Sequence, residues 1–287
     1  MPELPEVETV RLQLLHKVAG KRIKNVTIMN PKTVNSDPTF AERLSGQTLE
    51  HIDRIGKLMI FSFKKKPDLF LLVHLKMTGQ FFFVDREGIT GGGHSMTESD
   101  TRELPGKHTR VAFHFTDKST LYFNDMRKFG YIKIATATEV TLARSKYGEE
   151  PIHDTFDREL FASRLKKRKT TIKAALLDQS FIAGLGNIYV DETLFRAAVR
   201  PTRRADRVTK TEALAIAEHS GAVMRHAISV GGTTFQHFVD TEGDTGNYTN
   251  YLQVFGKQNT PCPICQTIIK KSRVAGRGTH YCPQCQK

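Results

Sequence analysis

The sequence has no long apolar run and very little cysteine, and each shortage limits what the protein can be. No stretch of the 287 residues is both apolar and long enough to span a bilayer. The start of the chain lacks the basic and then apolar pattern of a secretory leader, so we expect a soluble, intracellular protein. The only cysteines are Cys262, Cys265, Cys282 and Cys285, a distribution that argues against disulfide stapling.

Acidic residues are the minority among the charged side chains. Lysine and arginine together number 43 against 30 aspartates and glutamates, which gives a formal net charge of +13. Because the basic residues recur along most of the chain, the composition favours a polyanionic partner such as nucleic acid. The length also exceeds that of a typical single domain, so we expect two compact units joined by a linker.

The hydrophobic pattern changes once along the chain. Apolar residues at helical spacing predict a helix over residues 5–19. Short runs rich in Val, Ile, Phe and Tyr then predict strands of a sandwich or barrel at residues 22–29, 58–63, 69–75, 80–84, 110–115, 120–123 and 131–134. The polar, glycine-containing segment 86–107 is predicted to be a mobile loop with too few apolar residues for a strand. From Pro151 onward the pattern predicts helices, at residues 157–168, 171–177, 187–197 and 209–230.

The cysteines form two C-x-x-C pairs separated by sixteen residues. This spacing is typical of two knuckles that close a tetrahedral thiolate site around zinc. Four sulfurs leave no open coordination position, so we expect a structural ion that holds a hairpin too small to bury a core. Arg273 and Arg277 lie beside glycines where the tip of this hairpin is expected, a setting suited to phosphate binding.

Two further motifs contain residues that could take part in catalysis or in phosphate binding. Pro2 becomes a secondary amine once Met1 is removed, and such an amine can act as a nucleophile with Glu3 as its acid/base partner. Taken alone, Pro2 is also a permissive start residue. The run Gly184-Leu-Gly-Asn-Ile-Tyr189 places glycines before a helix, where phosphates bind readily. The alternative is an ordinary turn between helices with Asn187 as the N-cap.

Three segments together resemble the formamidopyrimidine-DNA glycosylase family over the whole chain. They are Pro2-Glu-Leu-Pro-Glu-Val-Glu8, residues 183–192, and Val274-Ala-Gly-Arg-Gly-Thr-His-Tyr-Cys282. The resemblance implies a multidomain α+β fold. Its expected parts are an N-terminal β-sandwich with a catalytic N-terminal helix at 1–135, a linker at 136–150, a helix-two-turns-helix domain at 151–232, a lesion-capping loop at 233–250 and a zinc ribbon at 251–287.

The resemblance also implies a function. The family excises oxidised purines, 8-oxoguanine and formamidopyrimidines, from damaged double-stranded DNA in base excision repair. It is a bifunctional glycosylase and AP lyase that forms a Schiff base on Pro2 and proceeds by β,δ-elimination. Glu3 would be the general acid and Glu6 a supporting carboxylate. We expect one structural Zn²⁺, a monomer, no membrane association and a bacterial cytoplasmic, nucleoid-associated location.

Further site residues follow from the resemblance. Lys57 would contact phosphate and assist base release and β-elimination, and Arg277 would act in δ-elimination. Met77, Arg127 and Phe129 would fill the void left by the flipped nucleotide, although core packing is the alternative for Met77 and Phe129. The positions expected to touch the DNA backbone are His74, His108, Lys169, Asn187 and Lys257. The long 86–107 segment and Lys107-His108-Thr109-Arg110 depart from the usual family pattern.

Two other functions stay open. The first is an endonuclease VIII-like glycosylase for oxidised pyrimidines, against which Leu4 and the set Met77, Arg127 and Phe129 favour the purine branch. The second is a non-catalytic zinc-ribbon protein that binds DNA. The joint presence of Pro2, Glu3, Lys57 and Arg277 argues against this second alternative.

Overall fold

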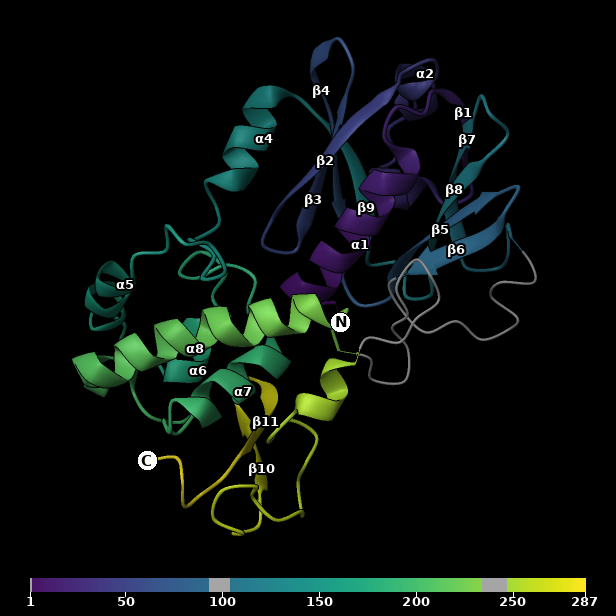
Figure 1. The fold of residues 1–287 in the computed structure, drawn as a ribbon. Helices are drawn as coiled ribbons and strands as arrows, with labels where there is room; N and C mark the ends of the chain where they lie inside the picture. Colours follow the sequence, from purple (N-terminus) through teal and green to yellow (C-terminus); the bar gives the residue numbers. More distant parts are fainter. Residues whose placement is uncertain (1, 93–103, 234–246) are drawn as a thin grey trace. The chain divides into compact units, whose positions relative to one another are not determined.

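The structure is a computed structural model that describes residues 2–92, 104–233 and 247–287 (Figure 1). The chain divides into two compact units. The first comprises Met1–Ser145 and Val230–Asn247, and the second comprises Lys146–Ser229 and Tyr248–Lys287. The first unit is built on sheets and the second on helices with a small hairpin, which confirms the predicted α+β class.

Two antiparallel sheets form the first unit. The five-stranded sheet has the order β1-β7-β8-β5-β6, with bounds Ile23–Ile28, Thr109–Phe115, Thr120–Asp125, Gly79–Asp85 and Gly88–Gly92. The four-stranded sheet has the order β2-β3-β4-β9, with bounds Leu49–Ile55, Leu58–Phe63, Lys66–His74 and Tyr131–Ala135.

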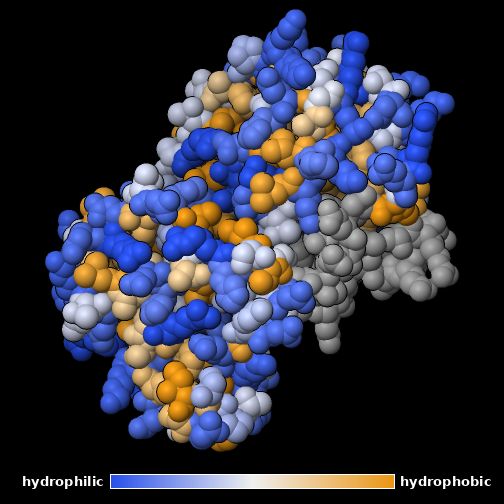
Figure 2. Space-filling view, viewed as in Figure 1, coloured by the Kyte–Doolittle hydropathy of each residue, from blue (hydrophilic) through white to orange (hydrophobic). Residues whose placement is uncertain are grey.

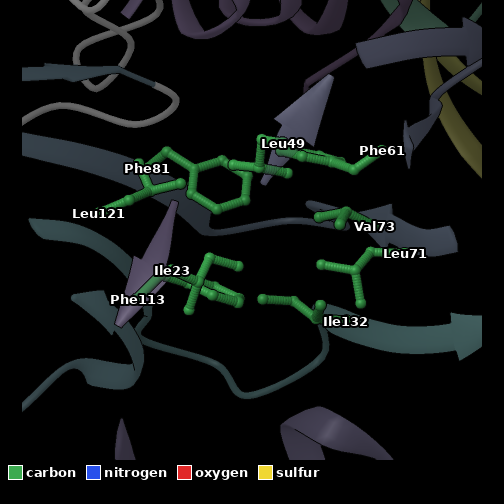
Figure 3. Close-up of a pocket in the computed structure, with 9 residues that line it drawn as sticks. All are labelled: Ile23, Leu49, Phe61, Leu71, Val73, Phe81, Phe113, Leu121 and Ile132. Atoms are coloured by element: carbon green, nitrogen blue, oxygen red, sulfur yellow. The ribbon is translucent and has the colours of Figure 1, made fainter. Parts of the chain in front are cut away.

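Apolar side chains that alternate along the strands of both sheets form one core. In β5, Phe81 and Phe83 join this core, whereas Phe82 between them packs in a separate small cluster with Ala112 and Tyr122. Successive side chains of a strand point to opposite faces, so the same strand serves two clusters. Figure 3 shows apolar side chains of both sheets around a void of about 10 Å³. A void of this size with an apolar lining is a packing gap and too small for a ligand.

Helix α1 (Leu4–Val18) packs against this sheet core. Its residues Val7, Val10 and Leu14 are at most 1% exposed and lie one above another on one helical face. Shorter elements complete the unit, namely η1 (Pro31–Val34), α2 (Phe40–Leu44) and α4 (Ala137–Arg144). Helix α4 lies within the stretch predicted to be a linker and begins with a capping box between Thr136 and Glu139.

The prediction that segment 86–107 contains no strand was wrong. Strand β6 pairs with β5 in register, Val84 opposite Ile89 and Asp85 opposite Gly88. The hairpin turn is fixed by Asp85, whose Oδ1 accepts a hydrogen bond of 2.8 Å from the Glu87 N–H. An edge strand gains its pairing from the backbone, so a shortage of apolar side chains did not exclude it. The central part of the segment, residues 93–103, lies outside the described residues.

The second unit contains the four predicted helices and the ribbon. The helices are α5 (Arg158–Leu165), α6 (Ile172–Leu177), α7 (Asn187–Arg196) and α8 (Lys210–Ser229). The other elements are η2 (Ala205–Arg207), η3 (Tyr248–Tyr251), β10 (Lys270–Val274) and β11 (Arg277–Tyr281). Asp157 and Thr171 cap α5 and α6 through their side-chain oxygens, which fixes where these helices begin.

The ribbon is part of the helical unit and takes its core partly from that unit. Phe195 of α7 packs in one apolar cluster with Val254 and Ile269 and with two of the cysteines, Cys262 and Cys282. The end of the chain is tied to the same unit, since the Lys287 N–H donates to the Ala198 carbonyl. The ribbon therefore shares its core with α7.

Two adjacent carboxylates of α7 reach into the ribbon. Asp191 is fully buried, pairs with the buried ammonium of Lys173 at 2.6 Å and accepts the His280 N–H of β11 at 2.8 Å. Glu192 accepts the backbone N–H groups of Gln253, Val254 and Phe255 at 2.9, 3.0 and 2.9 Å. Burial raises the pKa of Glu192, although these backbone hydrogen bonds favour its charged form.

The surface carries few large apolar areas on the face that Figure 2 shows, where hydrophilic side chains dominate the described residues. Within the described ranges, none of the helices combines the length and the apolar character needed to cross a membrane.

We predict that Lys173→Met lowers the free energy of unfolding by about 3–5 kcal/mol, because it leaves the buried Asp191 carboxylate without its cation. The control is Glu159→Gln, which breaks the exposed Lys210–Glu159 pair of the same unit and should cause no measurable loss. Urea denaturation of both variants measures the difference. Equal losses would show that the buried Lys173–Asp191 pair contributes no more to the free energy of unfolding than the exposed pair.

Candidate functional site

The start of the chain is fixed by Glu6. Pro2 is buried and Glu3 is 2% exposed at the N-cap of α1. One carboxylate oxygen of Glu6 accepts the Glu3 N–H at 2.8 Å, and the other accepts the Thr233 N–H at 2.8 Å. Gly232 makes this approach possible, because a Cβ there would lie 3.0 Å from Glu6 Oε1 and its φ is +83°. Glu6 thus joins the Pro2-Glu3 segment to the chain that follows α8.

Lys57 lies in the two-residue turn between β2 and β3. Ile55 pairs with Leu58 across the turn, and Gly56 has a φ of +56°, which suits glycine at this position. Lys57 is 6% exposed, so it is a buried lysine and not an ordinary surface one. Leu58 pairs with His74 of β4, and the Lys57 charge contributes to the lowered pKa of His74. The structure therefore brings Lys57 and His74 together.

His74 is held as a neutral hydrogen-bond donor. Burial, together with the charges of Lys76 and Lys57, lowers the pKa of His74 to about 3. The Lys76 N–H donates to Nδ1 of the ring at 3.0 Å, so the proton of the neutral ring is on Nε2. An Nε2–H group can bind a phosphate oxygen without adding charge to the site.

Met77, Arg127 and Phe129 form an exposed cluster. Met77 lies between β4 and β5, and the other two lie between β8 and β9. The Arg127 guanidinium is 3.0 Å from Met77 Sδ and 4.7 Å from the centre of the Phe129 ring. Met77 is 37% and Phe129 53% exposed, so core packing does not account for these residues.

Asp125 holds the two turns of this cluster together, a role that the sequence reasoning missed. Its Oδ1 accepts from the Thr78 hydroxyl and, at 3.1 Å, from the Arg127 N–H. Its Oδ2 accepts the Gly130 N–H at 2.7 Å, and the side chain is 1% exposed. The available signal was an aspartate that opens a turn before Arg127, where such side chains bond the backbone two residues on.

His108 lies against the same aspartate. Its carbonyl accepts the Asp125 N–H at 2.9 Å, and Arg110 donates to the Asp125 carbonyl at 2.8 Å. The His108 ring is half-buried, and its Nδ1 has no hydrogen-bond partner among the described residues. Arg110, together with the His108 carbonyl, therefore supports the turn that carries Arg127.

In the second unit the structure brings Asn187 to the ribbon hairpin. Gly186 is the N-cap of α7, so the alternative that Asn187 is the N-cap is wrong. The Asn187 side-chain amide donates to the Gly278 carbonyl at 2.9 Å, next to Arg277. Arg277 is exposed after a two-residue turn in which Ala275 and Gly276 have φ values of +51° and +71°.

The other predicted backbone contacts of this unit are exposed lysines. Lys169 lies in the connection between α5 and α6. Lys257 lines a groove of about 570 Å³ together with Arg196 and residues of the 250–263 segment. Most of the predicted lesion-capping loop, residues 234–246, lies outside the described residues.

The four cysteine sulfurs fit one zinc ion. All lie within 4.8 Å of one another, with 3.8 Å between Cys262 and Cys285 and 3.5 Å between Cys265 and Cys282. A tetrahedral site with Zn–S bonds of about 2.3 Å has edges of roughly 3.8 Å. Four thiolates complete the coordination, so this is a structural zinc site, as predicted.

Comparison with known proteins accounts for nearly the whole chain. Residues 1–132 match the formamidopyrimidine-DNA glycosylase N-terminal domain, residues 147–239 the H2TH domain of the same enzyme, and residues 260–287 the zinc finger found in FPG and IleRS. With its paired sheets, helical unit and cysteine ribbon, the protein is of the DNA glycosylase class with a helix-two-turns-helix domain.

Relatives and solved structures define the family. Formamidopyrimidine-DNA glycosylases of Exiguobacterium sp. and Listeria monocytogenes are 41% and 40% identical to this chain, each over 100% of both sequences. A complex of Lactococcus lactis Fpg with abasic-site DNA superposes with a TM-score of 0.87 at 33% identity, again over 100% of both chains. The chain belongs to the formamidopyrimidine-DNA glycosylase family, which confirms the resemblance.

We predict that zinc removal loosens α7 as well as the ribbon, because Phe195 shares a core with two of the cysteines. Hydrogen exchange read by mass spectrometry should show faster exchange in α7 peptides of the chelated protein. Peptides from β3 and β4, whose core includes none of the cysteines, serve as the control. Unchanged protection of α7 after verified zinc loss would contradict the shared core.

We predict that His74 makes the protein less stable as the pH falls below about 6.5. The unfolded chain takes up a proton on this histidine near its ordinary pKa, whereas the folded ring stays neutral down to about pH 3. Between pH 6.5 and 5 the wild type should therefore lose about 1 to 2 kcal/mol more unfolding free energy than His74→Gln. His114 and His219, whose pKa values are also lowered by burial, are common to both proteins. Parallel stability profiles would refute a neutral His74.

Proposed function

We propose that this protein is a bifunctional DNA glycosylase and AP lyase that excises oxidised purines from duplex DNA in base excision repair. The observation that carries the proposal is the arrangement at the N-terminus, where Glu3, next to Pro2, is held by one oxygen of Glu6 while the other oxygen accepts the Thr233 N–H. Family membership adds support, since solved relatives from Lactococcus lactis are complexes with DNA that contains an abasic site or Fapy-dG.

The chemistry needs a free amine at Pro2. After removal of Met1, the Pro2 nitrogen attacks C1′ of the damaged nucleotide, the glycosidic bond breaks, and the base leaves with a proton supplied through Glu3. The C1′–O4′ bond then opens as the proton released from the Pro2 nitrogen passes to O4′, which leaves an iminium between Pro2 and C1′. The iminium acidifies the C2′ hydrogens, so that loss of one expels the 3′ phosphate, and a second elimination expels the 5′ phosphate. Lys57 contacts phosphate and assists base release and the first elimination, and Arg277 assists the second elimination. An acylated Pro2 nitrogen has no nucleophilic lone pair, so the active enzyme begins at Pro2.

The exposed cluster of Met77, Arg127 and Phe129 replaces the nucleotide that leaves the stack. Flipping a base out of a duplex costs a few kcal/mol, which inserted side chains offset. Since Arg127 already contacts the other two residues, the cluster needs little reorganisation before insertion. The segment 233–250 would cover the flipped base.

Phosphate contacts would hold the duplex while this happens. They come from His74, His108, Lys169, Asn187 and Lys257, with the zinc ribbon presenting Arg277. The enzyme would work as a monomer on damaged double-stranded DNA in the bacterial cytoplasm, in association with the nucleoid.

An endonuclease VIII-like preference for oxidised pyrimidines is the second candidate. It is favoured by one finding, a complex of wild-type Lactococcus lactis Fpg with DNA containing an oxidized pyrimidine, at 34% identity and a TM-score of 0.86. That relative is itself an Fpg bound to such DNA, so binding alone does not separate the two candidates. Both lesion classes therefore belong in the test.

Borohydride trapping tests the proposal. We predict that protein lacking Met1, trapped on duplexes carrying 8-oxoguanine, a formamidopyrimidine or an oxidised pyrimidine, forms an adduct on its N-terminal peptide, with the purine lesions trapped fastest. Lys57→Ala should trap more slowly but at the same peptide. An adduct that mass spectrometry maps to an internal lysine would overturn the Pro2 mechanism, and fastest trapping on the pyrimidine lesion would favour the second candidate.

A further inference from the structure

Glu8 of α1 binds two arginines in an almost buried site. Its Oε2 accepts from Arg54 Nε at 2.7 Å and from Arg11 Nε at 3.0 Å, and its Oε1 accepts from Arg11 at 2.6 Å. The side chains of Arg54 and Glu8 are 5% and 14% exposed. Burial by itself would raise the pKa of Glu8, but the hydrogen bonds from Arg11 and Arg54 outweigh it and lower the pKa to about 2. Glu8 is therefore ionised at neutral pH.

The two arginines differ in what their other nitrogens bind. Arg11 donates to the Ile52 carbonyl at 2.9 Å, in the middle of β2. Arg54 donates to the Gly56 carbonyl at 2.9 Å. This carbonyl belongs to the peptide bond that joins Gly56 to Lys57, so the direction of that peptide group is set by the guanidinium.

Holding α1 against the sheet does not require this ion pair. Val7, Val10 and Leu14 already pack the helix into the apolar core. Removing two charges from water is costly, and a buried pair is often no more stabilising than apolar side chains of the same volume. What an arginine adds is a planar fork that fixes two acceptors relative to one another. Here the two acceptors are a residue of the catalytic helix and the turn that carries Lys57.

We propose that Arg54, held by Glu8, is a positioning residue that sets the Lys57 turn against the helix following Pro2 and Glu3. The inference rests on the function proposed for Pro2 and Lys57. A lysine at position 54 could keep the contact with Glu8, but it has no second arm for the Gly56 carbonyl. The turn would then be free to tilt, and displacements of about 1 Å in a catalytic site can cost on the order of 100-fold in rate.

The test is single-turnover excision of 8-oxoguanine at saturating enzyme. Arg54→Lys should slow excision by about 10- to 100-fold. Arg11→Lys is the matched control, because Arg11 shares Glu8 but bonds the strand instead of the turn, and it should change the rate by less than about threefold. Thermal denaturation checks that both variants fold. Equal rate losses in the two variants would overturn the inference.

A double-mutant cycle separates positioning from general stability. If Arg54 acts through Lys57, then Arg54→Lys should cause no further loss in a Lys57→Ala protein. Losses that multiply would overturn the inference while leaving the proposed role of Lys57 intact. A Lys57→Ala protein as fast as wild type would overturn both. Should Arg54→Lys not fold, the cycle of Glu8→Gln with Lys57→Ala decides in the same way, because Glu8 holds the guanidinium in place.

Discussion

The functional segments of both units depend on buried carboxylates that accept hydrogen bonds from backbone N–H groups. Glu6 holds the start of the chain, Asp125 holds the turn that carries Arg127, and Asp191 and Glu192 hold the ribbon. An ionised carboxylate is costly to bury unless each oxygen is satisfied, and its hydrogen bonds are about twice as strong as neutral ones. A loop that supplies those donors therefore has one preferred position, which suits residues that must meet DNA in a defined geometry.

The periodic elements could be predicted from the sequence, and the missed ones break the periodicity for physical reasons. Strand β2 was not predicted, because a register shift between Leu49 and His51 interrupts the alternation of buried and exposed residues. Leu49 and Ile52 are both buried although they are three residues apart. Strand β6 pairs through its backbone at a sheet edge. Helix α4 had a visible capping box, but Val140 is its only buried residue, which leaves no apolar stripe to detect.

The residues of the candidate site likewise fall into those that the sequence predicted and those that it did not. Chain motifs pointed to Pro2, Glu3 and the cysteines, because these signals are local. Residues that position the site were missed, because their partners are remote in sequence: Arg54 is 46 residues from Glu8, and Glu192 is 61 residues from Gln253. No local spacing encodes such a pair, and a charged residue in a strand or helix is more often solvated than buried. The fold has to bring the partners together before their role can be recognised.

The ribbon shows how these carboxylates and the zinc site act on one functional residue. The cysteines close the base of the hairpin, while Asp191 and Asn187 of α7 bind the backbone of β11 at His280 and Gly278. Arg277 lies between these contacts and the tight Ala275-Gly276 turn, so the backbone on both of its sides is fixed although its side chain is exposed. Zinc alone would close the knuckles but leave the direction of the hairpin unset. That direction is set by α7, whose first residue, Asn187, is itself a predicted phosphate contact. One helix therefore fixes both Asn187 and the backbone around Arg277, the two predicted DNA contacts at this end of the unit.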